Sequence, residues 1–262
     1  DMTAPRPAKG REAWLAAHGI AVQPDGILAG TAARFSPVKD LSTMLRGFAA
    51  AAKEEPRLHL ILAGSGAEEG KLHALAETLG VSGRVHFTGW LDDTDALYAC
   101  LDVVLLTSLS ETFPYALTDA ARYGVSVVST AVGGVPALVE DGVNGFLIAP
   151  GDAAALADRL LALSHDAALR KAFGAALREK TARKFSLAAM AGRERSICRT
   201  VIVPRREVVI AGAYGGGNRG DELMLENLLR DVRAAAPECA VTVLSRRPEE
   251  TARRFDADAL YY

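Results

Sequence analysis

The sequence predicts an α/β protein with a Rossmann-like parallel sheet, followed by a partial second α/β unit. From residue 26 onward, short apolar stretches alternate with segments of helical spacing. The stretches are apolar throughout, which is typical of strands buried on both faces of a parallel sheet. A fresh strand–loop–helix–strand order starts near residue 207 and stops at the end of the chain. These observations together predict two successive sheets of the same class.

The elements expected in the first unit follow from this alternation. Residues 1–24 form a lead-in with one helix, 11–20, which Gly19 ends. Residues 25–199 form the main domain, and its expected strands are 26–33, 57–64, 84–90, 102–108, 125–130 and 145–150. The expected helices are 41–54, 67–80, 94–101, 114–124 and 152–166, with further helix up to about Cys198.

The second unit is expected after a linker at 200–206. The pattern over 207–262 predicts the strands 208–214, 240–247 and 259–262 and the helices 223–236 and 248–255. A segment of this size is marginal as an independent α/β domain, because small chains bury little surface. We therefore expect it to be the front part of a larger domain. Because the chain begins with Asp1 and not with Met, we also expect it to be a piece of a longer protein.

Composition excludes some classes of function. A formal net charge of −2 gives no electrostatic basis for binding nucleic acid. The three cysteines are far apart and fit no metal or redox spacing, so we expect free thiols and a cytoplasmic location. No apolar run is long enough to span a bilayer, and nothing resembles a signal peptide. Five arginines within 192–207 favour a solvated linker, with peripheral contact at the inner face of a bacterial membrane as the alternative.

Two acids flank the loop that follows the fourth expected strand. Glu111 and Asp119 are eight positions apart, and Pro114 between them suits a first helical turn. Ligands of parallel α/β sheets bind outside the carboxyl ends of the strands. Two carboxylates there can accept hydrogen bonds from the hydroxyl groups of a nucleotide-sugar. The alternative is a pair of solvated surface acids.

Two cations follow the first expected strand. Arg34 and Lys39 share one loop at the same sheet edge, where they can clamp a diphosphate. Charge-assisted hydrogen bonds of this kind contribute roughly 1.5–3 kcal/mol each. A solvated surface pair is again the alternative. The short acid pair Asp93 and Asp95 has the spacing of a metal motif, but acids in a first helical turn more often cap the helix.

Several motifs together resemble a known family. The chain resembles the donor-binding half of a retaining GT-B glycosyltransferase of family 4. The segments that match in order and spacing are "RFSPVK", "LILAGSG", "VHFTGW", "DVVLLTSLSETF" and "ALTDAARYGVSVVSTAVGGVPALVEDGVNGFLIAPGD". The resemblance runs from about residue 11 to 198. It implies the C-terminal half of a GT-B fold, a UDP-, ADP- or GDP-sugar donor, and no metal or other cofactor. It also implies a saccharide acceptor on a separate N-terminal domain, so that this chain alone binds donor and transfers nothing.

The resemblance assigns roles to individual residues. Arg34 and Lys39 would contact the diphosphate, Glu111 would contact the donor sugar as the catalytic residue, and 85–87 would flank the base. Asp119 would hold the ribose hydroxyls. The family normally has Glu at this position, and the shorter Asp would weaken the contact or make it water-mediated. The donor-binding set is Arg34, Lys39, Gly64, Phe87, Thr112, Phe113, Pro114 and Asp119.

The second unit opens with a glycine-rich loop. "GAYGGGNRGDELMLENLL" follows a buried strand and begins a helix, where a phosphate can lie over the free N–H groups. A mere turn is the alternative. With "NRGDE", the segment 207–262 resembles the beginning of the polysaccharide pyruvyl transferase family, which transfers a pyruvyl group from phosphoenolpyruvate to a sugar. The ligand-lining candidates are Gly217, Asn218, Gly220 and Asp221.

The functional expectation combines both resemblances. We expect the donor half of a retaining glycosyltransferase joined to the start of a pyruvyl transferase, serving bacterial cell-envelope or exopolysaccharide biosynthesis. The alternative is a non-catalytic scaffold domain that keeps the donor-site fold and is attached to a pyruvyl transferase.

Overall fold

The chain folds into two compact units, Asp1–Lys184 and Phe185–Tyr262. The computed structural model describes residues 10–201, 207–214 and 219–261. Among the described residues, no helix is both long and apolar enough to cross a membrane.

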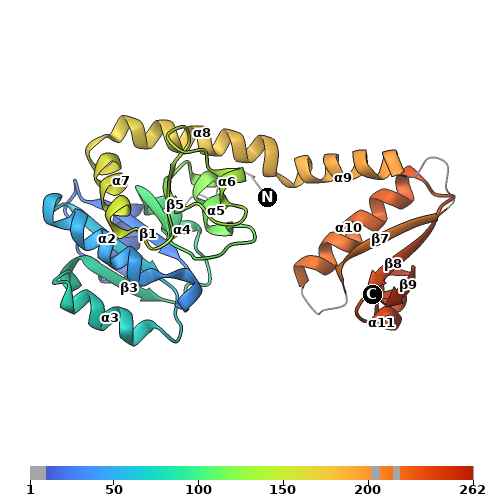
Figure 1. Ribbon diagram of the computed structural model, residues 1–262, viewed down its shortest axis with the longest axis horizontal. Coiled ribbons are helices and arrows are strands. Elements are labelled where there is room, and N and C mark those ends of the chain that lie inside the picture. Colours follow the sequence, from blue (N-terminus) through green and yellow to red (C-terminus); the bar gives the residue numbers. More distant parts are fainter. Residues whose placement is uncertain (1–9, 202–206, 215–218, 262) are drawn as a thin grey trace. The chain divides into compact units, whose positions relative to one another are not determined.

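A six-stranded parallel sheet forms the centre of the first unit, with the order β3-β2-β1-β4-β5-β6 (Figure 1). The strands are β1 (Ile27–Ala32), β2 (Leu58–Ala63), β3 (Val85–Gly89), β4 (Val103–Leu106), β5 (Ser126–Thr130) and β6 (Phe146–Ile148). Each strand falls inside its predicted range, and the predicted α/β class is confirmed. The register pairs Ile27 with Leu58 and Ala29 with Val103, so β1 lies centrally between β2 and β4.

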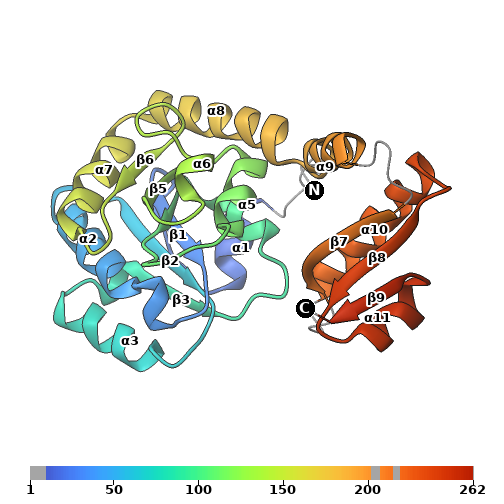
Figure 2. The ribbon, with the colours of Figure 1, turned by 45° about the vertical axis from the view of Figure 1, so that its right-hand side comes forward.

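Helices cover both faces of this sheet. They are α1 (Arg11–Ala17), α2 (Leu41–Glu54), α3 (Glu69–Thr78), α4 (Asp95–Cys100), α5 (Tyr115–Tyr123), α6 (Val135–Leu138), α7 (Ala153–His165) and α8 (Ala167–Phe185). Two short 3₁₀ helices, η1 (Pro37–Lys39) and η2 (Ser82–Arg84), complete the unit. Figure 2 shows α2 and α7 on one side of the sheet and α1 and α5 on the other.

The core follows from the alternation of side chains along the strands. Ile27 and Ala29 of β1 belong to the cluster that packs under α2 and α7. Leu28 lies between them on the opposite face and is also fully buried. Because both faces are covered, the strands are apolar at every position, as the sequence predicted. Burying one such leucine stabilises the fold by about 1.5–3 kcal/mol relative to exposure.

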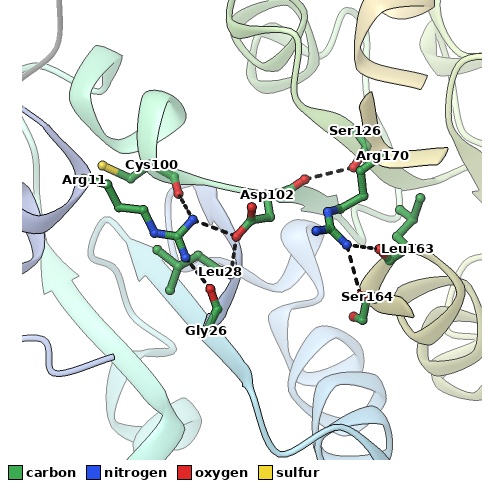
Figure 3. Close-up of polar contacts among 9 residues, drawn as sticks. All are labelled: Arg11, Gly26, Leu28, Cys100, Asp102, Ser126, Leu163, Ser164 and Arg170. Carbon is green, nitrogen blue, oxygen red and sulfur yellow. Dashed lines mark hydrogen bonds and ion pairs between the residues drawn. The ribbon is translucent and has the colours of Figure 1, made fainter. Parts of the chain in front are cut away.

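The amino edge of the sheet is fastened by one arginine (Figure 3). Arg11 of α1 donates from Nη1 to Asp102 Oδ2 at 2.9 Å and to the carbonyl of Cys100 at 3.3 Å. Its Nη2 donates to the carbonyl of Gly26. Asp102 Oδ2 also accepts from the amide of Leu28 at 2.8 Å. These bonds join α1 to the starts of β1 and β4, at the edge opposite the loops described below.

A second arginine joins two helices of the first unit. Arg170 of α8 donates to the carbonyls of Leu163 and Ser164, the latter at 3.0 Å (Figure 3). These carbonyls belong to the last turn of α7 and have no partner within that helix. Arg170 therefore caps α7 and fixes α8 against it.

The second unit is smaller and has a three-stranded parallel sheet of order β7-β8-β9. Its elements are α9 (Leu187–Val201), β7 (Glu207–Tyr214), α10 (Arg219–Ala235), β8 (Ala240–Ser245), α11 (Pro248–Phe255) and β9 (Asp258–Tyr261). Leu225, Leu229 and Val232 of α10 pack on Ile210 and Val243 of the sheet. The predicted strand–helix order of this unit is present in the structure.

Candidate functional site

The loops at the carboxyl edge of the first sheet converge where the chain reverses direction. The chain runs outward from β1 to β2 and β3, then returns to the other side of β1 with β4. The loops that follow β1 and β4 therefore meet at the switch point of the strand order, which is called the β1–β4 crevice below and is the usual ligand position in such sheets.

An ion pair joins these two loops. Lys39, from the loop after β1, places Nζ 2.6 Å from Oε1 of Glu111, which lies in the loop after β4. The hydroxyl of buried Ser108 donates to the same Oε1 at 2.6 Å. The side chains of Lys39 and Glu111 are 25% and 10% exposed. Within the described part of the chain, Oε2 of Glu111 has no hydrogen-bond partner, so it is available to accept from a ligand hydroxyl.

Backbone contacts hold the two loops together. Thr107 Oγ1 donates to the carbonyls of Lys39 and Asp40, at 3.0 Å each. The amide of Leu109 donates to the carbonyl of Val38 at 2.8 Å. Asp40 itself has a φ of 43°, and its carboxylate accepts from the Thr43 amide at the start of α2. The position of Lys39 is thus fixed from both sides before any ligand binds.

Two glycines support the Glu111 loop from behind. A Cβ at Gly133, whose φ is +50°, would lie 1.6 Å from the carbonyl oxygen of Glu111. A Cβ at Gly134 would lie 2.4 Å from the carbonyl oxygen of Thr112. The Gly134 amide donates to the Glu111 carbonyl at 3.3 Å. Only glycine permits this close approach, and it sets the path of the backbone through Thr112 to Pro114.

Arg34, in the same loop as Lys39, lines a hollow at the ends of β1 and β2. The hollow has a volume of about 290 Å³ and is lined by Ala32, Ala33, Arg34, Ala63, Gly64, Trp90, Leu91 and Thr94. The indole of Trp90 is 71% exposed. Among the described residues, Arg34 has no ion pair or hydrogen bond from its side chain, so its charge is free to meet an anion. An aromatic face and a guanidinium beside one hollow suit a nucleotide.

Asp119 lies on α5, where it shares an arginine with the start of α4. Arg122 Nη1 is 3.1 Å from Asp95 Oδ1 and 3.8 Å from Asp119 Oδ1. Burial raises the pKa of Asp119 above its ordinary value, while the Arg122 charge lowers it and that of Asp95 raises it. Asp95 directly follows Thr94, which lines the hollow. Asp119 is therefore linked through Arg122 to the rim of the hollow.

The family follows from comparison with known proteins. A family model described as glycosyl transferases group 1 matches residues 16–180, more than half of the chain. The chain belongs to the glycosyl transferases group 1 family. The matched range contains the crevice, the hollow and all six strands of the first sheet, so the group 1 domain is the first unit described above.

Curated relatives share this domain. The lipopolysaccharide core biosynthesis glycosyltransferase LpsE of Rhizobium meliloti is 36% identical over 137 residues, covering 52% of this chain and 39% of that protein. The N-acetyl-alpha-D-glucosaminyl L-malate synthase of Bacillus anthracis is 32% identical over 151 residues, covering 58% and 39%. The chain therefore spans about two fifths of the length of these two relatives.

Solved glycosyltransferase structures of GT-B type share the fold. Anabaena HepE in complex with UDP and glucose has a TM-score of 0.68 and 26% identity, covering 78% of this chain and 55% of that chain. Sucrose-phosphate synthase from Thermosynechococcus elongatus has a TM-score of 0.68 and 25% identity, covering 78% and 51%.

Within the group 1 domain, Phe87 packs against the rings of two other residues. Phe87 of β3 stacks on His73 of α3, with 3.8 Å between ring centroids, and meets Phe35 edge-on at 6.2 Å. Its side chain points to the α3 side because alternate residues of a strand face opposite sides. Phe87 lines a second hollow with His73, Val85 and His86, whereas Trp90 and Leu91, just past the end of β3, line the hollow that Arg34 also lines. The placement of 85–87 beside a base stays a prediction.

In the acid pair after β3 of the group 1 domain, Asp93 bonds the first amide of α4, whose N-cap Thr94 makes no side-chain cap bond. Asp93 Oδ1 accepts from the amide of Asp95 at 2.9 Å, at the start of α4. In the part of the chain that the structure describes, no cluster of three or more histidine, cysteine or acidic residues could hold a metal ion.

The candidates outside the group 1 domain are only partly described. Gly217 and Asn218 lie outside the described residues. Gly220 and Asp221 lie in the first turn of α10. Burial raises the pKa of Tyr214, the last residue of β7, and the charges of Glu194 and Asp221 raise it further. Asp221 is thus close to the carboxyl end of β7, as the predicted strand–loop–helix arrangement requires.

Sequence reasoning missed three site residues. Ser108 could not be inferred, because its bond to Glu111 depends on how the loop after β4 turns back. Trp90 stood in the quoted motif "VHFTGW", but its exposure beside Arg34 depends on packing of separate loops. Arg122 had a usable signal, because it lies three positions after Asp119 on an expected helix.

Proposed function

We propose that the first unit binds the nucleotide-diphosphate sugar donor of a retaining glycosyltransferase of family 4 that acts in bacterial envelope or exopolysaccharide assembly. The observation that carries the proposal is the Lys39–Glu111 pair, which joins the loops after β1 and β4, together with Arg34 in the same loop as Lys39. Arg34 and Lys39 bind the diphosphate, and Glu111 accepts a hydroxyl hydrogen bond from the sugar through Oε2. Retention of configuration rests on the motif resemblance to family 4.

The remaining donor contacts follow from the loops. The backbone from Thr112 to Pro114 lies beside the sugar, and Asp119 holds the ribose. Gly64 gives the diphosphate close access to the backbone, and Trp90 covers the base. The proposal agrees with the UDP and glucose in the HepE structure, which has the same fold. The saccharide acceptor binds on a domain that the matched curated relatives have room for in the rest of their length.

Calorimetry of the full 262-residue chain against UDP, ADP and GDP tests this proposal. We expect heat of binding with at least one nucleotide. In Arg34→Ala, the affinity for that nucleotide should fall about 10-fold or more, because a charge-assisted hydrogen bond is removed. Arg46→Ala is the matched control, since Arg46 is exposed on α2 and has no ion pair among the described residues. No heat with any nucleotide contradicts the proposal.

A non-catalytic scaffold is the second candidate function. It is favoured by Asp119, which is shorter than the glutamate that the family resemblance leads one to expect. An eroded ribose contact would be repaired by Asp119→Glu, so this function predicts a gain of nucleotide affinity in that variant. An unchanged or lower affinity argues against it.

For the second unit, we propose the start of a pyruvyl transferase that takes phosphoenolpyruvate. Support comes from the parallel β7-β8-β9 sheet and from Asp221 in the first turn of the helix after β7. A nucleotide-sugar and phosphoenolpyruvate are both cytosolic metabolites, so we place the protein in the cytoplasm. Peripheral contact of the arginine-rich segment 192–207 with the inner face of the membrane is the alternative. Titration with phosphoenolpyruvate tests the assignment, and Asp221→Asn should weaken any binding.

A further inference from the structure

Arg122 lies between two carboxylates that belong to different helices of the proposed donor site. Its Nη1 is 3.1 Å from Asp95 Oδ1 on α4 and 3.8 Å from Asp119 Oδ1 on α5. The three side chains are only 20%, 21% and 34% exposed, so solvent screens this contact weakly. Arg122 thereby bridges the proposed ribose acid and the helix that starts at the rim of the hollow.

The bridge controls the charge as well as the place of Asp119. Burial and the neighbouring Asp95 both raise the pKa of Asp119, and Arg122 opposes them. Two carboxylates without the cation between them repel, and one of them would tend to take up a proton. A protonated acid accepts hydrogen bonds less well, and a repelled one moves away from its partner.

We infer that Arg122 is a positioning residue for the ribose: it holds the short Asp119 side chain, ionised, where a ribose hydroxyl can reach it. The inference rests on the proposed donor function. In this view, the Asp95–Arg122–Asp119 bridge positions the short Asp119 side chain close enough to contact the ribose, as a longer glutamate would do without a bridge. Asp119 and Arg122 then act together in binding the ribose. This differs from a site that has lost its ribose contact and from an ion pair that only stabilises the fold.

The test compares nucleotides with and without ribose hydroxyls. Calorimetry of the full chain uses UDP, ADP and GDP, each against its 2′,3′-dideoxy analogue. In the wild-type protein we expect the ribose form of the bound nucleotide to bind on the order of 10- to 100-fold more tightly. Arg122→Met should reduce this ratio toward one by weakening the ribose form and leaving the dideoxy form unchanged.

Further variants separate positioning from stability. Asp119→Glu alone should not increase the ratio of ribose-form to dideoxy-form affinity. Asp119→Glu combined with Arg122→Met should recover part of the ratio that Arg122→Met loses, because the longer acid no longer needs the bridge. Asp95→Asn is a milder change if Arg122→Met does not fold, and it should lower the ratio in the same direction. Arg46→Met is the matched control and should leave the ratio unchanged.

The outcomes distinguish the inference from the proposed function. An unchanged ratio in both Arg122→Met and Asp95→Asn overturns the inference while nucleotide binding stands. Equal weakening of ribose and dideoxy forms also overturns it, since that result reports a general structural role. Wild-type protein that binds none of the six compounds overturns the proposed function and this inference together.

Discussion

Replacing Lys39 by Met probes the centre of the proposed site. The change keeps most of the apolar stem of the side chain and removes the ammonium that lies 2.6 Å from Glu111. The carboxylate, 10% exposed, is then left with the Ser108 hydroxyl as its hydrogen-bond donor among the described residues. The variant should therefore lose both stability and diphosphate affinity.

The magnitudes follow from burial. Breaking a fully buried ion pair costs about 3–5 kcal/mol, and an exposed pair contributes about 0–1 kcal/mol. Because Lys39 keeps a quarter of its surface exposed, we expect the free energy of unfolding to fall by about 1–3 kcal/mol. Loss of the charge-assisted hydrogen bond should weaken the binding of a nucleotide diphosphate by roughly 10- to 100-fold.

Urea unfolding followed by tryptophan fluorescence measures the first quantity. Both tryptophans, Trp14 and Trp90, lie in the first unit, so the signal reports that unit alone. Calorimetry measures the second quantity. Lys53→Met is the matched control, since Lys53 is exposed near the end of α2 and has no ion pair among the described residues. A Lys39→Met protein that matches this control in both measurements would refute the reasoning.

Three further variants test other parts of the account. Gly133→Ala should lower stability by more than Gly142→Ala, because both adopt positive φ but only a Cβ at Gly133 meets the Glu111 carbonyl, and thermal unfolding compares them. Burial and a neighbouring imidazole lower the pKa of His86 to about 4, below its ordinary value of 6.5. Stability should therefore fall as the pH drops from about 6.5 to about 4, and His86→Phe should reduce the difference between unfolding free energies at about pH 5 and about pH 7.5. Arg11→Met should lower the free energy of unfolding by about 1–3 kcal/mol and leave nucleotide affinity unchanged, because it lies at the opposite edge of the sheet. An altered affinity in Arg11→Met, measured by calorimetry, argues against the separation of the two edges.

Much of the fold could be predicted because strand and helix patterns are local. The helix expected at 41–54 is α2 residue for residue, since its helical spacing is visible in the sequence. The predicted helix 114–124 began one residue too early, because Pro114 is the N-cap of α5 and the helix starts at Tyr115. Helix α6 was missed, because four residues carry too little periodicity to be recognised.

The site was predicted less completely, and the difference has a physical cause. Lys39 and Glu111 could be brought together from sequence because parallel strands place their following loops at one edge. The contacts of Phe87 could not be predicted, because they depend on which helix packs against the strand, and here Phe87 stacks on His73 of α3. The contact of Arg122 with Asp95 joins residues of two separate helices, so only half of that bridge could be read from local spacing.

The most direct test of the central claim is a nucleotide titration of ¹⁵N-labelled protein followed by amide chemical shifts. With UDP, ADP or GDP, we predict that the largest changes cluster in the loops at the carboxyl edge of the first sheet, namely 33–39, 64–66, 90–94, 108–114 and 133–134. Largest changes at the amino edge around Arg11 and Asp102, or none with any of the three nucleotides, would contradict the account.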